Sequence, residues 1–131
     1  MAKIALDIAE KEINSWLDQK KISNSKRTAK KDNVETLVNA ISDGDLILND
    51  DFTLTQSLKF PLAGLKELKY KSRLSTAQVQ AALRGAKLND GYAIIISVMG
   101  ALTGELMPSV QEFDTEDFSI GQAIASFFLP S

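Results

Sequence analysis

The strongest helix signals in the chain lie in residues 113–129, FDTEDFSIGQAIASFFL. Asp114 is a favourable N-cap residue, and Asp117 stands three positions later, where a side chain can reach back to the cap in a variant of the capping box. Apolar side chains then repeat at the spacing of one helix face, at Ile120, Ala123, Ile124, Phe127 and Phe128. The stretch therefore predicts an amphipathic helix that packs against the rest of the chain.

A second apolar helix is predicted just upstream, through residues 92–102, with an N-cap at Asn89-Asp90 and an end at Gly104. Its apolar residues cover more than one stripe, which is typical of a helix that is buried on several sides. We therefore expect this helix to be the central buried helix of the fold. Residues 88–131 contain no basic residue, and the whole segment is typical of packing rather than of chemistry.

The middle of the chain has the period of two that is typical of strands. A hairpin is predicted between residues 46–48 and 52–60, across a turn at residues 49–51, and residues 68–72 form a third alternating stretch. Gln56 is the one polar residue on the apolar side of the second strand. These strands predict a small antiparallel sheet that is polar on one face.

The remaining segments are predicted to be helical. Apolar spacing gives helices over residues 4–18 and 32–42, and a capping box at Ser75 and Gln78 starts another over residues 76–84. The fold class is α+β, with about five helices and a three-stranded antiparallel sheet made of the hairpin plus one strand. We expect residues 1–131 to form a single domain, with an N-terminal helical arm at 1–44, a basic linker at 20–31 and an α+β core at 45–131.

The composition excludes catalytic and metal sites that are built from cysteine or histidine. The 131 residues include no cysteine and no histidine, so thiolate nucleophiles, disulfides and the commonest metal ligand are absent. The acidic cluster at residues 43–51 lacks the ligand spacing of a calcium loop, because Ile47 stands where an oxygen side chain is needed. We predict no catalytic, cofactor or metal site, no enzyme activity and, given the short apolar runs, a cytoplasmic protein rather than a membrane protein.

Charged residues are grouped along the chain. The basic cluster comprises Lys20, Lys21, Lys26, Arg27, Lys30 and Lys31. Cations of this kind can bind phosphates, but no aromatic residue is interleaved to stack on bases, so a solvated linker is the favoured interpretation. Blocks of opposite sign alternate along the sequence, which leaves self-association into a homo-oligomer open.

From residue 52 to residue 129 the order of features resembles phage tail assembly chaperones of the Mu type. Four pieces carry the resemblance: LKFPL at 58–62, ELKYKSR at 67–73, ALTG at 101–104, and DTEDF at 114–118 leading to Phe127-Phe128. The first 50 residues have no counterpart in the family. They are either an added oligomerisation arm or a sign that the chain is a different phage component.

The resemblance implies a non-enzymatic helper in the host bacterial cytoplasm that binds tape-measure or tail-tube protein and keeps it soluble during tail assembly. The predicted partner-binding residues are Phe127, Phe128 and Leu129, an apolar cluster next to the C-terminal end of the sequence. Two alternatives stay open: a structural component of the virion, such as a neck or head–tail joining protein, and a small nucleic-acid-binding regulator that uses the basic cluster.

Overall fold

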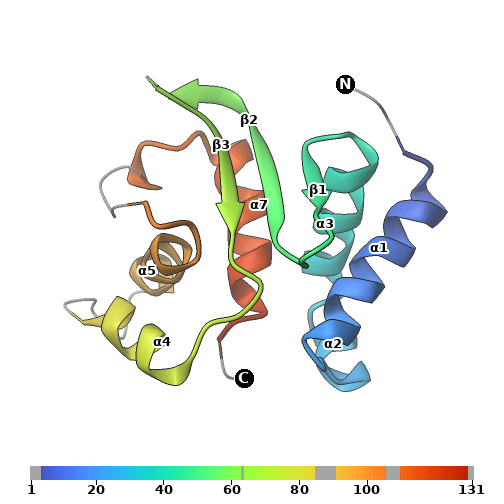
Figure 1. The fold of residues 1–131 in the computed structure, drawn as a ribbon, viewed down its shortest axis with the longest axis horizontal. Coiled ribbons are helices and arrows are strands. Elements are labelled where there is room, and N and C mark those ends of the chain that lie inside the picture. The colour runs from blue at the N-terminus through green and yellow to red at the C-terminus, as the bar shows by residue number, and fades with distance from the viewer. Residues whose placement is uncertain (1–3, 63, 85–90, 106–109, 130–131) are drawn as a thin grey trace.

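The computed structural model describes residues 4–62, 64–84, 91–105 and 110–129, and within these ranges the chain is an α+β fold of six helices and three strands (Figure 1). The elements are α1 (Leu6–Gln19), α2 (Asn24–Ala29), α3 (Lys31–Ser42), β1 (Leu46–Leu48), β2 (Leu54–Leu62), β3 (Leu65–Tyr70), α4 (Thr76–Leu83), α5 (Gly91–Thr103) and α7 (Thr115–Ser126). The predicted fold class is confirmed. The N-cap expected at Asn89-Asp90 lies outside the described residues.

The sheet has the order β1-β2-β3 with both pairs antiparallel, as the hairpin pattern predicts. Leu54 lies opposite Leu48 on one side and Tyr70 on the other. Side chains on β2 alternate between buried and partly exposed, so one face of the sheet contacts the core and the other is polar. Phe52, expected to open the second strand, lies instead in the turn with a φ of 65°, and β2 begins at Leu54.

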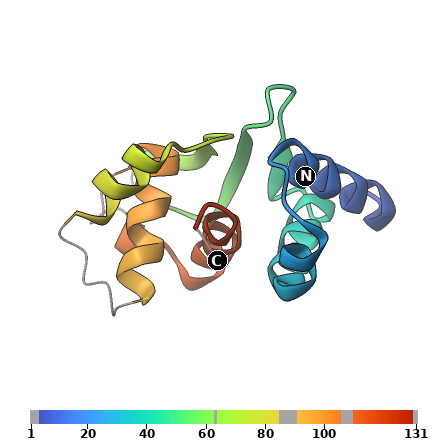
Figure 2. The same ribbon diagram turned by 90° about the horizontal axis from the view of Figure 1, so that it is seen from below.

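Helix α7 is the central element of the structure. In both views it lies between α4 and α5 on one side and α1 to α3 on the other, and it also packs against β2 (Figures 1 and 2). The expectation that residues 92–102 form the central buried helix is wrong. Only one side of α5 is buried, through Ser97, Val98, Met99 and Leu102, whereas Tyr92 is 68% exposed.

The N-terminal helices share one hydrophobic core with the rest of the chain. Ile13, Trp16 and Leu17 of α1 are fully buried, and α3 packs against both α1 and α7. The basic stretch 20–31, expected to be a linker or a frayed helix start, contains the short helix α2, whose N-cap Ser23 accepts a hydrogen bond from the backbone N–H of Lys26. This stretch therefore forms a short capped helix where the sequence predicted a solvated linker.

The carboxylate of Asp117 is almost fully buried, at 1% exposure, and joins α7 to the sheet. Its two oxygens accept hydrogen bonds from the backbone N–H groups of Lys59 at 2.8 Å and Phe60 at 3.1 Å. These neighbouring amides lie where the β2–β3 register is irregular, so one carboxylate satisfies both donors. The capping-box role expected for Asp117 is wrong, whereas Asp114 does cap α7, by accepting from the N–H of Glu116.

Gln56 extends the same polar contact across the sheet. Its side-chain amide donates to the backbone carbonyl of Asp117 at 2.9 Å, and its carbonyl oxygen accepts from the hydroxyl of Tyr70 at 2.6 Å. Both Gln56 and Tyr70 are fully buried, yet every polar side-chain atom in this chain of contacts has a partner. Burial, followed by the charge of Asp117, raises the pKa of Tyr70, which therefore stays protonated as a donor.

We expect Asp117→Ala to lower the free energy of unfolding by about 2 kcal/mol, because two backbone N–H groups lose their acceptor in a partly buried region. Asp117→Asn keeps one acceptor oxygen and should cost less. Urea denaturation followed by circular dichroism measures both. Glu116→Gln is the matched control: this neighbour is exposed, and a loss there within about 0.5 kcal/mol is expected. Equal losses in the Asp117 and Glu116 variants would contradict the role of the buried carboxylate.

Gly121 on α7 permits the close approach of α5 and β3. A Cβ atom at this position would lie 2.2 Å from Cε of Met99 and 2.8 Å from the hydroxyl oxygen of Tyr70. We expect Gly121→Ala to destabilise the protein by about 1–3 kcal/mol through overpacking, and Met99→Ala in the same chain to relieve part of that clash. Gly91→Ala is the control, because a Cβ atom at residue 91 would have no neighbouring atom within 4 Å. Equal losses of stability for Gly121→Ala and Gly91→Ala in thermal unfolding would contradict overpacking at residue 121.

Candidate functional site

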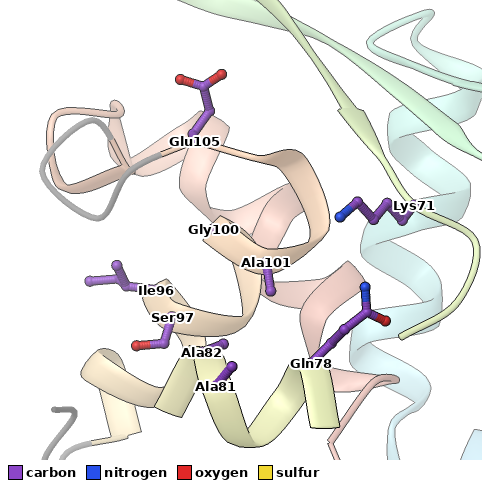
Figure 3. A pocket seen from close by; sticks show the side chains of 9 residues that line it. All are labelled: Lys71, Gln78, Ala81, Ala82, Ile96, Ser97, Gly100, Ala101 and Glu105. Carbon is purple, nitrogen blue, oxygen red and sulfur yellow. The ribbon is translucent and has the colours of Figure 1, made fainter. Parts of the chain in front are cut away.

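Three surface pockets among the described residues bear on function. The first lies between α4 and α5 and has a volume of about 430 Å³ (Figure 3). Small side chains form most of its wall, and Lys71 points across it toward the turn of α5 that carries Gly100 and Ala101, while Glu105 projects away. The buried hydroxyl of Ser97 has no hydrogen-bond partner among the described residues.

Among the described residues no group of acidic side chains is arranged to hold a metal ion. The acidic turn expected at residues 43–51 instead makes local contacts: Asp51 accepts from the backbone N–H of Thr53 at 3.1 Å, and Asp45 forms an ion pair with Lys59 at 3.5 Å. Hydrogen bonding to Thr53 lowers the pKa of Asp51. The carboxylate of Asp51 therefore stabilises the turn, and the carboxylate of Asp45 pairs with a lysine of β2.

An open groove, here called the aromatic groove, lies between α5 and the start of α7. It has a volume of about 300 Å³, and its apolar walls are Tyr92, Ile96, Val110, Phe113 and Phe118. The rings of Tyr92 and Phe118 stack with centroids 5.9 Å apart and an interplanar angle of 30°. Because Tyr92 is 68% exposed, this stack presents a large aromatic surface to water.

The side chains that line the aromatic groove are apolar or uncharged. Besides the five apolar residues they are Gln111, Thr115, Ser119 and Gln122. Glu112, Asp114 and Glu116 are neighbours of lining residues in the sequence, and residues 91–131 include no lysine or arginine. The segment that carries most of the groove is therefore acidic, and carboxylates at the start of α7 are favoured by the partial positive charge of a helix N-terminus.

The predicted partner-binding residues are divided between the core and a third pocket. Phe127 is 3% exposed and contacts the ring of Trp16 edge-on at 5.9 Å, so it is a core residue. Phe128 and Leu129 are half-buried and line a pocket of about 300 Å³ with Leu74 and other residues, here called the C-terminal pocket. Partner binding stays a prediction for these two residues.

Lysine side chains reach over the C-terminal pocket from the N-terminal helices. Nζ of Lys20 lies 3.3 Å from the ring centroid of Phe128 and 5.7 Å from that of Trp16, and Nζ of Lys26 donates to the carbonyl oxygen of Leu129 at 3.1 Å. Burial, then the charges of Arg73 and Lys26, lowers the pKa of Lys20 to about 8. The half-buried ammonium of Lys20 thus lies next to other cations.

Half of the basic cluster is engaged within the fold. Besides Lys20 and Lys26, Arg27 forms an ion pair with Asp18 at 2.7 Å and donates to the carbonyl of Ile22 at 3.0 Å. An arginine held in this way has fewer donors for phosphate. The arrangement favours a structural role for Arg27 over the phosphate contact that the nucleic-acid-binding alternative needs.

Three comparisons with known proteins return nothing: no protein-family model, no curated protein and no solved structure matches this chain. In the described ranges no helix is long and apolar enough to cross a membrane. The pockets and the resemblance described above are therefore the features that bear on function.

The apolar pattern of the sequence does not indicate the aromatic groove as a binding site. It places Tyr92 in a helix buried on several sides, and Phe113 and Phe118 lie more than 20 positions further along the chain. The sequence does contain one signal of the groove. Apolar residues cover more than one stripe of α5, whereas a single buried face needs only one stripe. Some of these apolar residues are therefore left exposed on the surface.

The stability of the protein should depend on pH through Lys20. Between pH 8 and its ordinary pKa of 10.5, the unfolded chain retains a proton that folded Lys20 has released, so stability rises with pH in this window. We expect the free energy of unfolding of the wild type, relative to Lys20→Met, to increase by about 1 kcal/mol from pH 7 to pH 9.5, after allowing for solvent screening of a partly exposed group.

Urea denaturation across this pH range measures the difference, with Lys11→Met as the matched control on the exposed face of the same helix. The series stays below pH 10, because the raised pKa of Tyr70 makes its ionisation in the unfolded chain lower the stability above that pH. A difference between the wild type and Lys20→Met that is constant with pH would contradict the lowered pKa of Lys20.

Proposed function

We propose that this chain is a non-enzymatic chaperone of phage tail assembly, which binds tape-measure or tail-tube protein in the host cytoplasm through the aromatic groove. The observation that carries the proposal is the exposed Tyr92–Phe118 stack in an open apolar groove. The identity of the client comes from the resemblance of residues 52–129 to tail assembly chaperones of the Mu type. A holding function of this kind requires apolar contact surface and no catalytic side chain.

The aromatic groove suits reversible binding of an apolar segment. Tyrosine supplies a large rigid surface with few rotatable bonds, so ordering it costs little conformational entropy. Burying the exposed part of Tyr92 in a complex would contribute about 2 kcal/mol. That contribution is large enough to select apolar clients and small enough to allow their release into the growing tail.

The charge of the surrounding segment supports the same function by limiting self-association. Residues 91–131 include five acidic residues and no lysine or arginine. Like charges brought together disfavour association, so two copies that met through this segment would repel each other. An exposed aromatic surface can therefore stay available to a client.

We expect a tagged chain, isolated from cells in which the phage is replicating, to recover tape-measure or tube protein by mass spectrometry. Tyr92→Ala should reduce that recovery at least 10-fold, because it removes the exposed half of the aromatic stack. Phe60→Ala is the matched control, since Phe60 is an exposed aromatic residue on β2, 55% accessible, whose side chain does not line the groove and whose backbone N–H contact with Asp117 the substitution retains.

Purified virions are searched for the chain in parallel. Its absence from the particle, together with client recovery that depends on Tyr92, is the expected result. Stable presence in the particle would overturn the chaperone proposal in favour of a structural joint, such as a neck or head–tail joining protein. If the wild-type chain recovers no tail protein, both the assignment as a chaperone and the assignment as a structural joint are rejected.

A further inference from the structure

Cations from three separate segments gather at the C-terminal pocket. Lys20 follows the end of α1, Lys26 belongs to α2, and Arg73 lies in the connection between β3 and α4. Lys20 and Lys26 contact Phe128 and the carbonyl of Leu129 directly. The charge of Arg73 is close enough to Lys20 to oppose its protonation. The fold therefore brings together like charges that are 53 positions apart in sequence, from residue 20 to residue 73.

No carboxylate of the described residues forms an ion pair with these cations. The ion pairs of the described residues are Arg27 with Asp18 and Lys59 with Asp45, and neither includes Lys20, Lys26 or Arg73. Within the described ranges the cluster therefore carries positive charge that no paired carboxylate neutralises.

The cations border an apolar pocket rather than open solvent. Leu74, Val79, Phe127, Phe128 and Leu129 line the C-terminal pocket, together with Lys26 and Thr76. An anion bound here would meet positive charge at the rim and would place an apolar group against the floor. Ion pairs formed partly out of water are screened less than pairs on an open surface.

We propose that the C-terminal pocket binds a peptide segment that carries aspartate or glutamate next to a large apolar side chain. The carboxylates would pair with Lys20, Lys26 and Arg73, and the apolar side chain would fill the space between Val79 and Phe128. A nucleic acid fits the site less well, because Nζ of Lys20 covers one face of the Phe128 ring at 3.3 Å and blocks that face for base stacking.

This site is independent of the proposed chaperone function. The aromatic groove lies at the start of α7 and has no charged residue in its lining, whereas the C-terminal pocket lies beyond the end of α7 and is lined by Lys26. The two pockets share no residue, so each can be disabled separately. Loss of client binding through Tyr92 would leave the acidic-peptide site unaffected.

Trp16 provides a built-in probe of the pocket. It is the only tryptophan of the chain, and its ring lies 6.2 Å from Phe128 and 5.7 Å from Nζ of Lys20. A carboxylate that pairs with Lys20 changes the electrostatic surroundings of the indole. Binding can therefore be followed by the fluorescence of Trp16 in the unlabelled full chain.

The test uses two amidated hexapeptides that differ only in charge, one alternating glutamate with leucine and phenylalanine, the other alternating lysine with the same apolar residues. We expect the acidic peptide to change the fluorescence of Trp16 saturably and the basic peptide to have no effect. The affinity for the acidic peptide should fall at least 10-fold between 50 and 500 mM NaCl, because the contact depends on charge.

The double variant K26Q/R73Q should weaken binding of the acidic peptide at least 10-fold, whereas K11Q/K66Q, which removes two exposed lysines elsewhere, should leave it unchanged. Arg73→Gln alone, at an exposed position in a connecting segment, should weaken binding several-fold and guards against a folding defect in the double variant. Far-ultraviolet circular dichroism checks that each variant is folded.

Three results would overturn the proposal. The first is equal binding of the acidic and basic peptides, or equal affinity of K26Q/R73Q and the wild type. The second is a Trp16 response to single-stranded DNA or to anionic phospholipid vesicles that is stronger than the response to the peptide. The third is a doubled mass in sedimentation that K26Q/R73Q abolishes, which would identify a second copy of the chain as the occupant of the pocket.

Discussion

One buried carboxylate, that of Asp117, joins the central helix α7 to the sheet. Asp117 accepts from two consecutive backbone N–H groups of β2, and Gln56 connects the backbone of the same residue to Tyr70 on β3. A buried charge is tolerated only when hydrogen bonds replace the lost water, and here both carboxylate oxygens have a donor. These contacts fix the first turn of α7 against the irregular part of the sheet, and the other helices pack around α7.

The small residues of α7 explain why it can be central. Gly121, Ala123, Ala125 and Ser126 are all buried, so neighbouring elements approach the helix closely on several sides. Gly121 allows Met99 and Tyr70 to approach its backbone, and α3 packs on the opposite flank, as the two views of the fold show (Figures 1 and 2). A helix built from large side chains could not serve as the axis of so compact an arrangement.

Both ends of α7 adjoin a pocket. The groove at its N-terminus has an apolar and uncharged lining, and the carboxylates of Asp114 and Glu116 in the same turn are favoured by the helix dipole. Lys20 and Lys26 lie beyond its C-terminus, where exposed carbonyl groups favour positive charge, and Lys26 donates to the carbonyl of Leu129. The charges near the two ends of the helix thus follow the direction of its dipole.

Local spacing in the sequence accounts for the features that depend on neighbours a few positions apart. The capping box at Ser75, the cap at Asp114, the end of α5 before Gly104 and the hairpin across residues 49–51 follow from this spacing, and the α+β class follows from them.

Contacts between side chains that are far apart in the sequence depend on tertiary packing. The acceptor role of Asp117 involves donors 57 and 58 positions away, so its local capping pattern predicted the wrong partner. Gln56 interrupts the apolar pattern of β2 because its side chain accepts a hydrogen bond from Tyr70, which lies on another strand. The exposure of Tyr92 likewise depends on how α5 packs against α7. Local patterns encode which residues are apolar and where elements begin, but the partner of a buried polar group is chosen by packing.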